Sequence, residues 1–94
     1  MASISEEEKI LEAAVAGIPR VAEVVASIPE EERPRALDAV ERSYRQTVCD
    51  LGYEEGPVQS WVSAVMFRLQ REVRNQESRK RNVLEALHQE LEQA

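Results

Sequence analysis

Cysteine, histidine, glycine and aromatic residues are all scarce in this chain of 94 residues. It contains one Cys, one His and three Gly, and aromatic residues make up 4% of it. A single cysteine can form neither an intramolecular disulfide nor a cysteine-based zinc site, which excludes disulfide-rich secreted scaffolds and zinc fingers. The cysteine count favours a reducing compartment, and we expect the protein to be cytoplasmic.

Long apolar runs are missing as well. The most apolar stretch, residues 13–28, is interrupted by Arg20 and Glu23 and contains Gly17 and Pro19, so we do not expect it to cross a membrane. The N-terminal residues are acidic, whereas signal and transit peptides are basic, and they predict no export signal.

Glutamate, alanine, valine and arginine are the commonest residues, with 43% apolar and 32% charged residues in total. This composition is typical of helices rather than sheets, and the length suits one small domain. We therefore predict an all-α fold, a small bundle of four to five helices. The expected helices cover residues 5–17, 19–27, 34–51, 57–75 and 78–92, and the last two can form one long helix.

Capping residues and prolines set the expected helix ends. Ser5, followed by three glutamates, predicts a helix start. Pro34 and Pro57 suit the first turns of helices, and Gly52 is the expected left-handed terminator. Pro19 either kinks one helix or separates two short ones, and we favour two.

Apolar residues recur at spacings of three and four along these segments, which predicts one buried face on each helix. The clearest amphipathic pattern lies between Pro34 and Leu51. The side chains that we expect in the core are Leu11, Val15, Ile18, Val21, Val25, Leu37, Val40, Tyr44, Val48, Leu51, Val62, Val65, Leu69 and Val73.

The end of the chain has a different pattern. Residues 74–82 contain no apolar side chain, and an apolar stripe then resumes. An isolated helix of this length is marginal in water, so the stripe needs a partner surface, in the same chain or in a second subunit. We expect a single helical domain at 1–77 and a C-terminal helical segment at 78–94 that takes part in dimerisation.

Trp61 and Phe67 fit the apolar face of residues 57–75 poorly. Trp61 lies at its edge, and Phe67 lies about 140° from its centre on a helical wheel. Phe67 therefore packs against a third helix or against a second subunit, since exposed clusters of large apolar groups mark contact surfaces. The predicted interface consists of Trp61, Phe67, Val83, Leu84, Leu87 and Leu91.

The net charge of −6 is unevenly distributed. Residues 1–32 carry eight acidic and two basic side chains, whereas residues 66–82 carry two acidic and six basic ones. This basic strip, which could contact phosphates, consists of Arg68, Arg71, Arg74, Arg79, Lys80 and Arg81. Pairing with the acidic N-terminal third explains the same charges without a ligand.

Candidate catalytic residues are isolated. Cys49 lies near Arg42 and Arg45, which can make a thiol more reactive, but it has no candidate base. Glu85 and His88 match the Glu-x-x-His spacing of di-iron bundles, but Glu85 lies away from the apolar stripe. We therefore expect no catalytic, cofactor-binding or metal-binding residue and no enzymatic activity.

The sequence thus favours a small, non-enzymatic interaction or regulatory module that forms a homodimer and also binds another protein. It needs no cofactor and no membrane. The alternative is a nucleic-acid-associated regulator that uses the basic strip.

Overall fold

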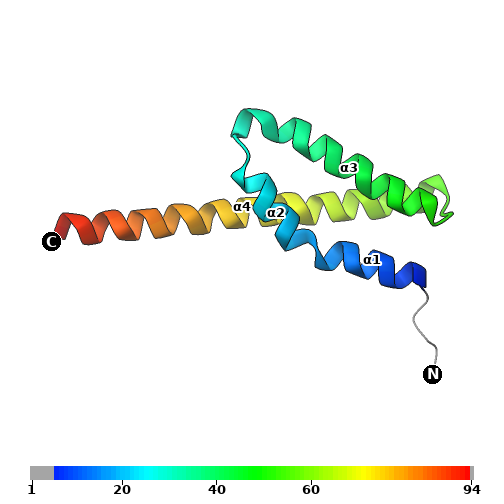
Figure 1. Ribbon diagram of the computed structural model, residues 1–94, viewed down its shortest axis with the longest axis horizontal. Coiled ribbons are helices and arrows are strands. Elements are labelled where there is room, and N and C mark those ends of the chain that lie inside the picture. The colour runs from blue at the N-terminus through cyan, green and yellow to red at the C-terminus, as the bar shows by residue number, and fades with distance from the viewer. Residues whose placement is uncertain (1–5, 94) are drawn as a thin grey trace, which may run out of the picture.

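The computed structural model describes residues 6–93, and these form helices joined by short connections (Figure 1). The helices are α1 (Glu6–Ala16), α2 (Ile18–Ser27), α3 (Arg33–Asp50) and α4 (Glu55–Gln93), with a 3-10 turn at Glu30–Glu32. The all-α prediction is confirmed for this part of the chain. The predicted cap at Ser5 lies outside the described residues.

The first two helices run into each other with a kink. The Gly17 N–H donates to the Ala13 carbonyl at 3.0 Å, and the Val21 N–H donates to the Gly17 carbonyl at 3.1 Å. Pro19 is the second residue of α2, where a helix does not need its N–H. If α1 and α2 are counted together as one kinked helix, the described residues form three helices. The expected number of four to five helices was therefore too high.

The turn between α3 and α4 contains the left-handed glycine that the sequence predicts. Gly52 follows the cap residue of α3 with a φ of 88°, and its N–H donates to the Cys49 carbonyl at 3.0 Å. A left-handed glycine at this position ends a helix and reverses the chain. The two helices therefore run antiparallel (Figure 1).

The last helix is one continuous rod of 39 residues. It begins two residues before Pro57 and passes through the polar residues 74–82 without a break. This stretch has no Gly or Pro, so nothing in it interrupts the backbone hydrogen bonds. The helix alone is about 58 Å long at 1.5 Å per residue.

The core lies where α2 and α3 pack on one face of α4. Its side chains are Ile18, Ala22, Val25, Tyr44, Val48, Val58, Val62, Val65, Met66, Leu69 and Val73. Leu11, Val15, Val21, Leu37 and Val40 surround this core and are half-buried. Leu51, which was expected in the core, is half-buried at the end of α3.

The molecule is elongated rather than a closed bundle. Its extents are 59 × 37 × 16 Å and its radius of gyration is 17.5 Å, against about 12 Å for a compact domain of this length. The cause is visible in Figure 1, where the second half of α4 runs past every other helix. We call residues 6–77 the head and residues 78–93 the arm.

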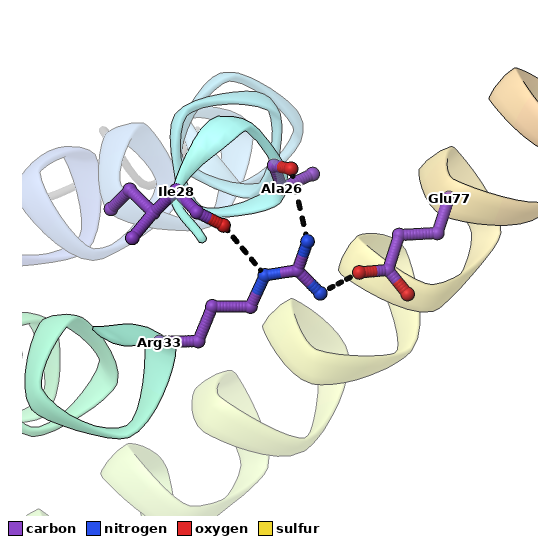
Figure 2. Close-up of polar contacts among 4 residues, drawn as sticks. All are labelled: Ala26, Ile28, Arg33 and Glu77. Atoms are coloured by element: carbon purple, nitrogen blue, oxygen red, sulfur yellow. Dashed lines mark hydrogen bonds and ion pairs between the residues drawn. The ribbon is translucent and has the colours of Figure 1, made fainter. Parts of the chain in front are cut away.

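One arginine ties three segments together at the boundary between head and arm (Figure 2). The Nε of Arg33 donates to the Ile28 carbonyl at 3.0 Å, and its Nη2 donates to the Ala26 carbonyl at 3.1 Å. Its Nη1 forms an ion pair with Glu77 of α4. Because carbonyls at a helix end lack partners within the helix, this guanidinium caps α2 and fixes it against α4.

Candidate interaction surface

The apolar side chains of the arm face solvent. Val83 is 59% exposed, Leu84 62%, Leu87 51% and Leu91 72%. Every residue from 78 to 93 is exposed, so no described part of the chain covers this surface. We call these four residues the arm stripe.

The arm stripe repeats a pattern that is buried in the head. Each member lies 18 residues after a core residue of α4, which corresponds to five helical turns and a shift of about 27 Å. The corresponding residues, here called the head stripe, are Val65, Met66, Leu69 and Val73. Because five whole turns restore the direction of a side chain, both stripes lie on the same face of α4.

In the head, this face of α4 is covered by α2. Ile18, Ala22 and Val25 of α2 are buried in the same core as the head stripe. Arg33 holds the C-terminal end of α2. Gln76 of α4 holds the N-terminal end, because its Nε2 donates to the Pro19 carbonyl at 3.0 Å. The face of α4 therefore emerges uncovered just beyond these contacts.

An open groove lies at the point where the arm leaves the head. It has a volume of about 740 Å³ and runs between α2 and the base of the arm. Pro19, Arg20 and Val24 line one side, and Gln76 and Lys80 line the other. Val24 is 57% exposed. On a helical wheel Lys80 points in the direction of the arm stripe, so the groove opens onto that stripe.

Trp61 and Phe67 lie on different sides of α4. Their separation of six residues corresponds to about 120° around the helix. Trp61 is half-buried, and its ring meets Tyr44 edge-on with a centroid distance of 5.9 Å and an interplanar angle of 83°. Phe67 is exposed, and no described residue covers it.

The six side chains of the basic strip are all exposed. Within residues 6–93, none of them forms an ion pair with a carboxylate. Arg71 and Arg74 flank Phe67 on the outer side of the head, whereas Arg79, Lys80 and Arg81 lie at the base of the arm.

The isolated candidates for chemistry stay apart in the structure. Cys49 is exposed on α3, and Glu85 and His88 are exposed on the arm. In the described part of the chain, no three His, Cys, Asp or Glu side chains are grouped as metal ligands. None of the helices in residues 6–93 combines the length and apolar character that a membrane span requires.

When the chain was compared with protein-family models, with curated proteins and with solved structures, none of these comparisons gave a match.

Sequence reasoning found the arm stripe but missed the groove and the arginine that holds α2. The relation between the two stripes could also have been found from the sequence. The 18-residue repeat shows that the arm stripe duplicates a core face of the head. No such signal existed for Arg33 and Glu77, because an ion pair across 44 positions leaves no periodic trace in the sequence.

Proposed function

We propose that this protein is a small, non-enzymatic cytoplasmic module that forms a homodimer through its arm and recruits another protein. The observation that carries the proposal is the exposed arm stripe on a helix that projects from the head. A straight helix with one apolar face buries that face against another helix. The single exposed cysteine suits a reducing compartment.

A second copy of the arm is a suitable cover for the stripe. The arm stripe of each copy consists of Val and Leu at the three- and four-residue spacings with which two helices interlock. Burying the exposed part of eight such side chains contributes roughly 8 kcal/mol at about 1 kcal/mol each. Association costs about 4 kcal/mol or more, so we expect a reversible, concentration-dependent dimer.

The non-enzymatic part of the proposal is supported by the separation of the reactive side chains. The thiol of Cys49 lies on α3, while the imidazole of His88 lies on the arm. Nucleophilic catalysis needs a nucleophile and a base within hydrogen-bond reach of each other, and these two side chains lie on separate parts of the molecule.

The dimer is tested by sedimentation equilibrium over a range of concentrations. Wild-type protein should approach twice the chain mass of 10.7 kDa as its concentration rises. Leu87→Glu should abolish this increase, because it places a charge in the apolar contact. Gln89→Glu is the matched control, since it adds the same charge about 160° away from Leu87 around the helix. A wild-type mass of one chain at every concentration would refute the dimer.

Phe67 contacts the recruited protein rather than the second copy of the chain. It lies on the side of α4 opposite the stripes, so one dimer contact cannot cover both. Arg71 and Arg74 beside it favour an acidic protein surface. Phe67→Ala should then reduce capture of that partner and leave the mass of the dimer unchanged. Trp61 contributes the exposed part of its half-buried ring to the contact with this partner.

The alternative is binding of nucleic acid by the basic strip. The observation that favours it is that all six basic side chains are exposed and have no carboxylate partner in residues 6–93. Binding to a mixed-sequence duplex should then fall steeply between low and physiological salt, because phosphate contacts release counterions. Absence of binding at low salt would eliminate this function.

A further inference from the structure

We infer that the two arms pair antiparallel, so that the end of each arm lies against the groove of the other copy's head. This inference rests on the proposed homodimer and adds its orientation and a second contact region. The groove residues concerned are Pro19, Arg20, Val24, Gln76 and Lys80.

The charges of the arm favour this orientation. Its first turn contains Arg79, Lys80 and Arg81, and its last turn contains Glu90 and Glu92. In an antiparallel pair, the basic turn of each copy lies beside the acidic turn of the other. In a parallel pair, basic turns would face basic turns and acidic turns would face acidic turns, which is unfavourable.

The position of α2 also opposes the parallel arrangement. Parallel arms would bring the two heads to the same end of the rod, where α2 already occupies the face of α4 that the arms share. The two copies of α2 would then compete for the same space. In an antiparallel pair the heads lie at opposite ends, and each meets only the end of the other arm.

The groove can receive that end. When Leu84 packs opposite Leu87 of the second copy, regular coiled-coil spacing places Lys80 opposite Leu91 of that copy. The aliphatic stem of Lys80 and the exposed Val24 can then cover this leucine. Glu90 and Glu92, which flank Leu91, would then lie near a groove whose lining contains three basic residues, Arg20, Arg79 and Lys80, and two acidic ones, Glu23 and Glu72.

Charge reversal at one or both ends of the arm tests the orientation. The first variant combines Arg79→Glu and Arg81→Glu, the second combines Glu90→Arg and Glu92→Arg, and the third carries all four changes. The dissociation constant of each is measured by sedimentation at low salt. For antiparallel arms, the first two should bind themselves about tenfold more weakly than wild type. The third should return to the wild-type value, because its ends are complementary again.

Equal dissociation constants for all four proteins would overturn the antiparallel orientation and leave the homodimer intact. A wild-type protein that never dimerises would instead refute the proposed function itself. Because all four substituted residues are exposed, the variants should fold like wild type, which circular dichroism checks.

Cross-linking gives an independent readout of the same orientation. In a Cys49→Ser background, a copy with Lys80→Cys is mixed with a copy that carries Leu91→Cys. Antiparallel arms predict a disulfide between the two different variants. Disulfides that form only between identical variants would show parallel arms and overturn the inference.

Discussion

The head and the arm present the same apolar pattern on the same helix, yet only the head covers it. Leu69 of the head stripe is fully buried, whereas its counterpart Leu87, five turns later, is 51% exposed. The residue types and their spacing are nearly the same, so the pattern itself does not produce the difference. What differs is the presence of a second helix across the face.

The cover over the head stripe depends on local connections. The Pro19 and Arg33 contacts hold α2 at both ends, and these contacts stop at Gln76 and Glu77. Beyond this point no other helix of the described residues lies on this face of α4, and every residue from 78 to 93 is exposed. A repeated core face that nothing in residues 6–93 covers is the physical basis for the proposed contact with a second copy.

The largest expected effect comes from truncating equivalent leucines in the two stripes. Leu69→Ala should lower the free energy of unfolding by about 2–5 kcal/mol, because it creates a cavity in the packed core. Leu87→Ala should change the stability of the dilute monomer by less than about 0.5 kcal/mol. Urea unfolding measures both, and equal losses would show that the arm stripe is covered within one chain.

The next effect comes from removing the arginine that holds α2. Arg33→Met should cost about 2 kcal/mol of stability, because two carbonyls at the end of α2 and Glu77 lose a charged partner. Arg35→Met is the matched control, since Arg35 is exposed on the same helix. Equal thermal unfolding of the two variants would show that Arg33 does not hold the cover in place.

The hydroxyl group of Tyr44 should lower the stability of the head slightly. This hydroxyl is buried and has no hydrogen-bond partner among the described residues. Tyr44→Phe should therefore raise the unfolding free energy by about 1 kcal/mol. A decrease would indicate that the hydroxyl has a bound water or another partner.

The same residue predicts a dependence on pH. Burial raises the pKa of Tyr44 above its ordinary value of 10.0. The unfolded chain then loses this proton first, so stability is complete below about pH 10 and falls as the pH rises further. Tyr44→Phe should reduce this fall, and the exposed Tyr53 provides the control variant Tyr53→Phe. If both variants followed the same curve, Tyr44 would not be the titrating group.

The smallest effect is expected at Phe67. Because its side chain is largely exposed in the head, Phe67→Ala should change the unfolding free energy by less than about 0.5 kcal/mol. Chemical denaturation measures this change. A loss comparable to that of Leu69→Ala would mean that Phe67 is packed.

The sequence was sufficient to predict which faces are apolar, but not how they are covered. Periodicity placed Val62 and Leu69 in the core, and Gly52 marked the end of α3, because both signals are local. The number of separate helices was wrong, since Gly17 and Pro19 bend the chain between α1 and α2, while backbone hydrogen bonds still connect these two helices. The groove and the Arg33 contacts depend on distant segments that meet only in the folded chain.

Amide hydrogen exchange at two protein concentrations tests the central claim most directly, because it reads the head and the arm of one molecule separately. We predict that amides of residues 80–93 exchange quickly in dilute solution and become protected at high concentration, while amides around Val62 and Leu69 keep the same protection. Exchange in the arm that does not change with concentration would contradict the account, because the arm stripe would then have no second copy to cover it.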